Sequence, residues 1–170
     1  MTPAALKDLL ERKLRALRRR PAFARSWESA RVHLPPEGAC EVRDGAAVLA
    51  VDLAPEEGGA GGAPRPGELM RASLGASLAL GYRLWAARLG VAIGAVDIDV
   101  ACEYDTRGQL DAAEALPAGW QRVVLDVRIA SDAPEADVRR VVETADRMSP
   151  MLGNLSPAVA RVHRLTVVRG

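Results

Sequence analysis

The chain has 170 residues, of which 49% are hydrophobic and 26% are charged, and its formal net charge is +1. This length and composition are those of one globular domain with a substantial core. The near-zero net charge gives no long-range attraction to nucleic acid or membrane surfaces, so we expect neither as a partner. The longest uncharged run, residues 72–82, is too short for a membrane span of about 20 residues.

The two cysteines, Cys40 and Cys102, are far apart in the sequence and form no CxxC motif. A disulfide framework is therefore not expected, which excludes the class of small secreted disulfide-rich proteins. The first residues, MTPAALKDLLERKL, are charged and lack the apolar core of a secretory signal. We therefore expect a cytoplasmic protein.

The first predicted element is a helix over residues 1–20. Thr2 is a suitable N-cap before Pro3, leucines recur at helical spacing, and Pro21 ends the pattern. The basic end of this helix, residues 18–20, lacks the interleaved aromatic residues of nucleic-acid-binding segments, which favours a solvated helix end. We interpret residues 1–21 as an N-terminal helical extension and residues 22–170 as the main domain.

Three strands are predicted next, at residues 26–34, 39–44 and 46–53. Asp44 and Gly45 predict a two-residue hairpin turn between the last two strands. A loop rich in glycine and proline, residues 54–67, then leads into a helix from about Pro66 to Leu89, which Gly90 ends.

Alternation of apolar and polar residues predicts further strands at residues 96–104 and 120–130, joined by a polar connection. Asp132 and Glu135 are spaced like the capping box of a helix, Ser149 and Pro150 begin a short helix, and residues 158–168 form a last strand. The order α-β-β-β-α-β-β-α-α-β indicates an α+β fold with antiparallel sheet and hairpins, without repeating β-α-β units.

Several well-known functional motifs are incomplete in this chain. Pro64 stands where a dinucleotide-binding loop needs its third glycine, and no P-loop lysine follows. Ser77 lies in a GxSxG-like stretch, but the last glycine is missing and the residue lies inside a helix. His33 and His163 are interpreted as sheet residues. No His, Cys or Asp cluster has metal-ligand spacing, so we expect no metal and no cofactor.

Five stretches occur in a characteristic order. They are Gly58-Gly-Ala-Gly-Gly, Pro64-Arg-Pro-Gly-Glu-Leu, Ala72-Ser-Leu-Gly-Ala-Ser, Glu103-Tyr-Asp-x-Arg-Gly and Ala145-Asp-x-x-Ser-Pro. With this order, residues 26–168 resemble the OsmC/Ohr family of thiol-dependent hydroperoxide reductases. The resemblance implies an α+β, OsmC-like fold in which antiparallel sheet wraps around long central helices. It also implies an intertwined homodimer.

Members of this family use a reactive cysteine in the central helix and a resolving cysteine at the start of a later helix. The resemblance places Ser77 at the first position and Ser149 at the second. The family's catalytic glutamate falls on Gly67, with Glu68 one residue late. Neither family cysteine is thus expected in this chain.

The family also uses an arginine from its N-terminal sheet. The resemblance leaves this residue open among Arg25, Arg31 and Arg43. It also leaves open whether the serines are natural or engineered.

Serine has neither an accessible anion near neutral pH nor the oxidation chemistry of a thiolate. We therefore expect a protein related to the oxidative-stress peroxidases that lacks peroxidase activity. It would keep a small apolar pocket for a small molecule at the dimer interface. The expected walls are Leu74, Met148 and Met151, with Glu68 at the polar rim.

Other interpretations stay open. Ser77 can be an ordinary helix serine that bonds to a backbone carbonyl, and Ser149 can be an N-cap. The chain can be an active peroxidase or hydrolase that uses Cys40, Cys102 or Ser77. It can also be an interaction protein that docks through the helix at residues 1–20.

Overall fold

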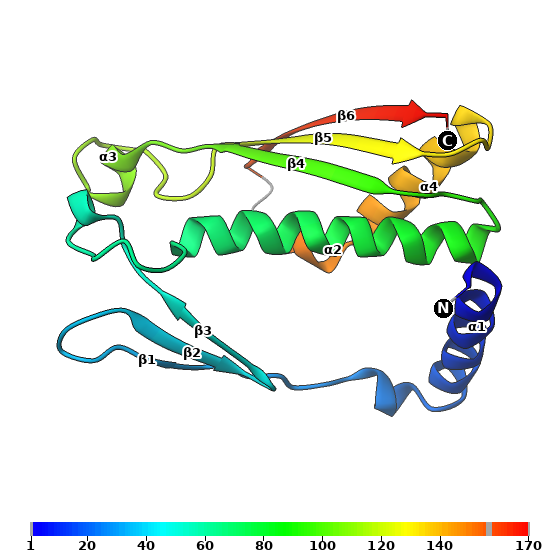
Figure 1. Cartoon of the computed structure of the whole chain (residues 1–170), viewed down its shortest axis with the longest axis horizontal. Helices are drawn as coiled ribbons and strands as arrows, with labels where there is room; N and C mark the ends of the chain where they lie inside the picture. Colours follow the sequence, from blue (N-terminus) through cyan, green and yellow to red (C-terminus); the bar gives the residue numbers. More distant parts are fainter. Residues whose placement is uncertain (1, 156–157, 170) are drawn as a thin grey trace. The chain divides into compact units, whose positions relative to one another are not determined.

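The computed structural model describes residues 2–155 and 158–169 (Figure 1). It contains two three-stranded sheets and several helices, which confirms the α+β class. The chain divides into two compact units, one of residues 13–70 and one of residues 1–12 and 71–170. Helices α1 (Pro3–Arg19) and α2 (Pro66–Leu89) each span a boundary between these units.

The predicted start and end of the first helix are confirmed. The Thr2 hydroxyl oxygen accepts a hydrogen bond from the Ala5 amide at 3.2 Å, as an N-cap does. Helix α1 ends at Arg19, and the short 3-10 helix η1 (Pro21–Ala24) follows. No residue of α1 is buried.

The unit of residues 13–70 contains an antiparallel sheet with the strand order β1-β2-β3. Its strands are β1 (Arg31–His33), β2 (Cys40–Asp44) and β3 (Ala47–Val51), and the 3-10 helix η2 (Pro55–Glu57) follows. The predicted hairpin is confirmed, but its two-residue turn lies one residue later than predicted, at Gly45 and Ala46, because Asp44 pairs with Ala47. Gly45 adopts φ +55° in this turn. The strand predicted at residues 26–34 is shorter than expected, since only residues 31–33 pair with β2.

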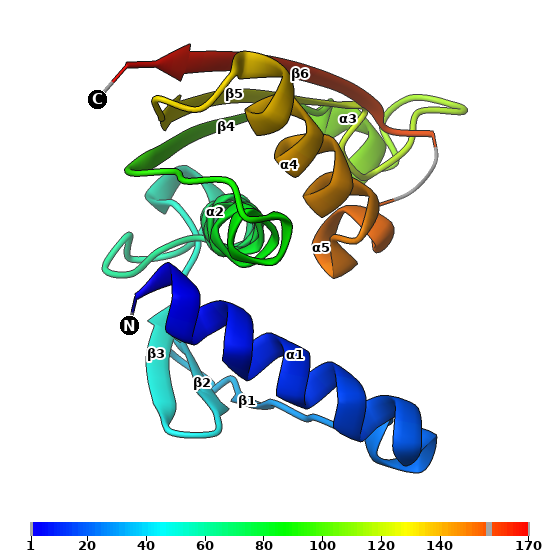
Figure 2. The same cartoon turned by 90° about the vertical axis from the view of Figure 1, so that its right-hand side faces the viewer.

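The larger unit contains the second sheet. Its elements are β4 (Val96–Glu103), α3 (Thr106–Gln109), β5 (Arg122–Ala130), α4 (Glu135–Arg147), α5 (Pro150–Gly153) and β6 (Ala160–Val168). Helix α4 and the part of α2 in this unit lie on the same face of the sheet (Figures 1 and 2). The sheet order is β4-β5-β6.

The predicted antiparallel pairing is found for β4 and β5 but not for β6. Strands β4 and β5 are antiparallel, but β6 runs parallel to β5 over nine residue pairs, from Arg122 opposite Ala160 to Ala130 opposite Val168. Helices α4 and α5 carry the chain back along the sheet before β6 begins, as parallel pairing requires. This part of the chain is therefore a β-α-β unit.

The core of this unit lies between the sheet and the two helices. Alternate residues of β5, from Val123 to Ile129, are at most 3% exposed. They pack with Leu74 and Leu78 of α2 and with the apolar face of α4. Not all of α2 is covered, because Leu80 is 52% exposed and Leu84 is 36% exposed. Helix α2 therefore has one buried apolar face and one open apolar face.

The predicted capping box of α4 is wrong. The N-cap is Pro134, and no side chain caps the helix there. The Ser131 hydroxyl instead accepts a hydrogen bond from the Ala133 amide at 3.1 Å and donates one to the Ala92 carbonyl at 2.6 Å. Ser131 therefore ties the turn before α4 to the chain that follows α2.

Candidate functional site

Helix α2 and the corner between α4 and α5 enclose a cavity of about 270 Å³, which we call the serine cavity. Ser77 and Ser149 both line it, as does Met148. The other lining residues are Leu78, Leu80, Gly81, Leu84, Trp85, Ala145 and Pro150. The structure thus brings three of the predicted site residues to one mostly apolar cavity.

Ser149 is held in place by the chain's own backbone. Its hydroxyl oxygen accepts a hydrogen bond from the Leu152 amide at 3.2 Å, so Ser149 is the N-cap of α5, and Pro150 is the first helical residue. The Ser149 amide donates to the Asp146 carbonyl at 3.1 Å, which links it to the end of α4. The N-cap interpretation of Ser149 is therefore confirmed.

Two predicted wall residues lie elsewhere. Leu74 is 1% exposed and belongs to the core beneath the sheet, because it lies on the buried face of α2. Met151 is partly buried and packs against that same core. Neither residue lines the serine cavity, and this part of the prediction is not met.

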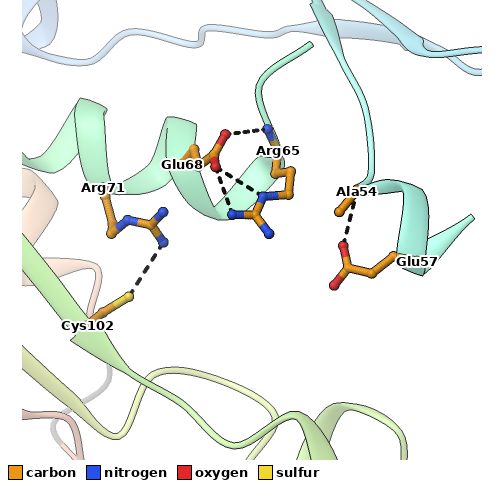
Figure 3. Close-up of polar contacts among 6 residues, drawn as sticks. All are labelled: Ala54, Glu57, Arg65, Glu68, Arg71 and Cys102. Carbon is orange, nitrogen blue, oxygen red and sulfur yellow. Dashed lines mark hydrogen bonds and ion pairs between the residues drawn. The ribbon is translucent and has the colours of Figure 1, made fainter. Parts of the chain in front are cut away.

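Glu68 lies in the first turn of α2, in the unit of residues 13–70, and it is engaged with Arg65 (Figure 3). Its carboxylate accepts hydrogen bonds from the Arg65 amide at 3.0 Å, from Nε at 3.1 Å and from Nη2 at 2.8 Å. A carboxylate at this position also suits the positive end of the helix dipole. Glu68 therefore has a structural role at the start of α2. Gly67 brings no side chain to this turn.

The three candidate arginines belong to the same unit as Glu68. Arg31 of β1 and Arg43 of β2 are opposite each other in the sheet. Arg43 Nε donates to the Glu41 carboxylate at 2.8 Å, while Arg25 follows η1 in extended backbone. Of the three candidates for the family's arginine, Arg43 thus has a carboxylate partner on its own strand.

The glycine-rich loop is organised around Asp52. The Asp52 carboxylate accepts hydrogen bonds from the amides of Leu53 at 2.8 Å, Ala60 at 3.0 Å and Gly62 at 3.3 Å. These bonds, with that of Leu53 the largest contribution, lower the pKa of Asp52. Because these amides already donate to the Asp52 carboxylate, they are not free to bind a phosphate group.

Cys102 lies on β4, on the face that carries Ile98 and Val100, and it is partly buried. Arg71 of α2 points Nη1 at the Cys102 sulfur at 3.7 Å (Figure 3). A second, shallow cavity of about 350 Å³ lies beside them, between α2 and β4, and Arg71 lines it. Cys40 begins β2 in the other unit, and both cysteines are free.

Sequence reasoning missed a polar network on three elements of the larger unit. The Tyr82 hydroxyl of α2 donates to Asp146 Oδ1 of α4 at 2.9 Å. His163 Nδ1 of β6 lies 2.8 Å from Asp146 Oδ2. Tyr82 is completely buried, and the side chains of Asp146 and His163 are 20% and 27% exposed. His163 is therefore a satisfied sheet residue, as predicted, but its partner is far away in the sequence.

The sequence held one weak signal for this network. His163 alternates with Leu165 and Val167 along β6, and those two residues pack against the core. A polar residue on the buried face of a strand needs a partner. The burial of Tyr82 and the charge of Asp146 also raise the pKa of the Tyr82 hydroxyl, since both disfavour its ionised form.

Within residues 2–155 and 158–169, no group of three or more His, Cys, Asp or Glu side chains could hold a metal ion. No helix of the described chain is both long and apolar enough to cross a membrane.

A family model described as OsmC-like protein matches residues 58–161, which is more than half of the chain. No curated protein matches the chain in sequence. The fold is similar to an OsmC-like protein from Mycoplasma pneumoniae, with 14% identity and a TM-score of 0.73, over 84% of this chain and 98% of that one. It is also similar to an organic hydroperoxide resistance protein OsmC from Legionella pneumophila, with 21% identity and a TM-score of 0.65, over 84% and 98%.

A third solved structure is the organic hydroperoxide resistance protein OhrB of Bacillus subtilis. It is 17% identical, with a TM-score of 0.55, and the match covers 81% of this chain and 98% of that one. At these identities the structures are evidence for the fold. The family model, which spans α2, β4, β5, α4, α5 and the lining of the serine cavity, shows that the chain belongs to the OsmC-like family.

Proposed function

We propose that this protein is a member of the OsmC-like family without thiol peroxidase activity, in which Ser77 and Ser149 occupy the two redox cysteine positions. The observation that carries the proposal is the serine cavity, because residues 72 positions apart in sequence both line it. Its walls are otherwise mostly apolar. The protein would use this cavity to bind a small apolar molecule.

The chemistry follows from the loss of sulfur. In a thiol peroxidase, a thiolate attacks the O–O bond, becomes a sulfenic acid and then condenses with a second thiol to a disulfide. A serine hydroxyl neither ionises near neutral pH without a base nor passes through these oxidation states. Gly67, at the family's glutamate position, also provides no carboxylate.

The direct test is hydroperoxide reduction with a dithiol reductant. The purified protein should not reduce cumene hydroperoxide faster than a control without protein. Turnover that is abolished by Cys102→Ala would instead assign a peroxidase reaction to the thiol beside Arg71. The contact between these two residues makes this the second candidate function.

Introduced thiols test the assignment of the two positions. The Ser77→Cys/Ser149→Cys variant should form an intramolecular disulfide under mild oxidation, because both positions line the same cavity. Ser73→Cys/Ser149→Cys is the matched control, since Ser73 is exposed on α2 and does not line the cavity. The first variant should regain only weak peroxidase activity, which Gly67→Glu should increase. Equal crosslinking of both variants would contradict the assignment.

We also propose that the protein is a homodimer. The three-stranded sheet of residues 13–70 has no buried residue in its strands, and Val32 and Val48 are 60% and 58% exposed. Trp27 is fully exposed, and Leu80 and Leu84 form the open face of α2. A small sheet without a packed face is not stable by itself, which favours cover by a second copy of the chain.

Analytical ultracentrifugation at low micromolar concentration tests the dimer. The expected mass is about twice the chain mass of 18.1 kDa. A folded monomer at this concentration would contradict the proposal.

A further inference from the structure

We propose that the serine cavity takes an uncharged, mainly apolar molecule whose one polar group is a hydrogen-bond acceptor, such as the carbonyl of a ketone or ester. The inference rests on the proposed function only in taking this cavity as the ligand site. Beyond the proposed function, the inference specifies the charge, the polarity and the size of the ligand.

The part of the cavity wall that this chain supplies carries no charge. None of its ten lining residues has an ionisable acid or base, and its strong hydrogen-bonding groups are two hydroxyls and the Trp85 indole N–H. A charged group buried against such a wall would lose its hydration and gain no opposite charge. A carboxylate or an ammonium group is therefore a poor fit.

Two charged side chains next to the wall, those of Asp146 and Arg88, are engaged within the protein. Asp146 follows the lining residue Ala145, but its two oxygens are taken by the Tyr82 hydroxyl and by His163 Nδ1. The Arg88 guanidinium lies over the ring of Trp85, 4.1 Å from its centroid. These contacts direct both charges toward groups of the protein, and no charged residue is among those that line the cavity.

The polar groups of the wall can all donate. As the N-cap of α5, Ser149 uses its oxygen to accept from the Leu152 amide, which leaves its O–H proton for a ligand. Trp85 has only a donor. Ser77 lies within α2, where a serine O–H can also bond to a backbone carbonyl one turn earlier. The geometry therefore points to Ser149 as the main donor and to an acceptor on the ligand.

The volume limits the size of the ligand. At about 270 Å³, the cavity is slightly smaller than typical sites for drug-sized molecules. It suits a molecule of about ten non-hydrogen atoms, given the roughly 300–1,000 Å³ of those larger sites.

Two probes of matched chain length, 2-octanone and octanoate, test the ligand class. Isothermal titration calorimetry on the full chain should show that 2-octanone binds at least about tenfold more tightly, because octanoate must bury an unpaired charge. Equal or tighter binding of octanoate would overturn the proposal. Failure of 2-octanone to bind up to its solubility would also overturn it.

Variants at Ser149 test the donor. Ser149→Ala should weaken 2-octanone about three- to tenfold, the usual effect of one lost neutral hydrogen bond. Ser149→Thr keeps both the N-cap oxygen and the donor, and should restore affinity. Ser73→Ala removes an exposed hydroxyl from the same helix and should change nothing. Unchanged affinity in Ser149→Ala would refute the role of this hydroxyl.

Gly81→Leu locates the binding site. Gly81 lines the cavity, and a Cβ built on it meets no atom within 4 Å, so a leucine there can enter the cavity without disturbing α2. This variant should keep its circular dichroism spectrum and lose 2-octanone binding. Retained binding by the folded variant would place the ligand elsewhere and refute the proposal.

These results are separable from those for the proposed function. If the two introduced thiols fail to crosslink, the assignment of the family positions fails, while the preference for 2-octanone is still measured. If octanoate binds better, the ligand class fails, while the crosslink still supports the assignment.

Discussion

Removal of the Tyr82 hydroxyl should destabilise the protein through Asp146. In Tyr82→Phe the completely buried ring is kept, so no cavity forms, and only the 2.9 Å hydrogen bond to Asp146 Oδ1 is lost. Hydrogen bonds to charged groups contribute about 1.5–3 kcal/mol, and we expect the free energy of unfolding to fall by this amount at neutral pH. The carboxylate would retain His163 as its partner.

Urea denaturation followed by circular dichroism measures this change. Tyr104→Phe is the matched control, because Tyr104 is the second tyrosine of the chain and is 52% exposed. The control should stay within about 0.5 kcal/mol of the unsubstituted protein. If Tyr82→Phe also stays within this range, the network does not stabilise the fold as argued.

The pH dependence of this variant follows from the raised pKa of Tyr82. Burial is the largest cause, and the charge of Asp146 and the hydrogen bond to it add to the effect. The folded-state pKa lies above the unfolded value of about 10, so the contribution of Tyr82 is present below that pH and is lost as pH rises above it. The protein should therefore lose stability above pH about 10 more steeply than Tyr82→Phe, by up to about 1.4 kcal/mol per pH unit. Parallel loss of stability in the two proteins would contradict this account.

Three further predictions concern glycines and the loop. Gly81→Ala should raise the free energy of unfolding by about 0.5–1 kcal/mol, because alanine favours a helix and the added Cβ meets no atom; a lower melting temperature would contradict this. Gly59→Ala should lower the free energy of unfolding by about 2 kcal/mol or more, since the added Cβ would lie 2.1 Å from the Leu53 carbonyl oxygen. Gly62→Ala, with open space around the Cβ, is the control, and an equal loss there would argue against the clash. Hydrogen-exchange protection of the loop amides should be present above the ordinary Asp52 pKa of about 3.9 and lost as pH falls through its lowered folded-state value. Protection that does not change with pH would show that the carboxylate does not hold the loop.

The helices and the first hairpin could be predicted because their signals are local. Caps, prolines and helical spacing lie within a few residues of each other, and α2 has the predicted bounds of Pro66 and Leu89. The turn at Gly45 needs only a residue that tolerates positive φ. In contrast, the direction of β6 depends on where α4 and α5 deliver the chain, and no local pattern carries that information.

The candidate site was predicted in part for the same reason. Family motifs placed Ser77 and Ser149, and both line one cavity. Leu74 was assigned to the wall because it is apolar and near Ser77, but the direction of its side chain depends on which face of α2 meets the sheet. The Tyr82–Asp146–His163 network joins three elements that are distant in sequence, so no spacing rule could reveal it.

The parallel pairing of β5 and β6 also sets an order of events during folding. Strand β6 is the last of the described strands to be synthesised, and it can pair only after α4 and α5 have closed the long connection from β5. Closing such a connection before its contacts form is slow compared with closing a hairpin. His163 reaches Asp146 only with β6, so an incomplete chain that ends before β6 has Tyr82 but not His163 as a partner for this carboxylate. The pairing of His163 with Asp146 therefore marks the completion of this unit.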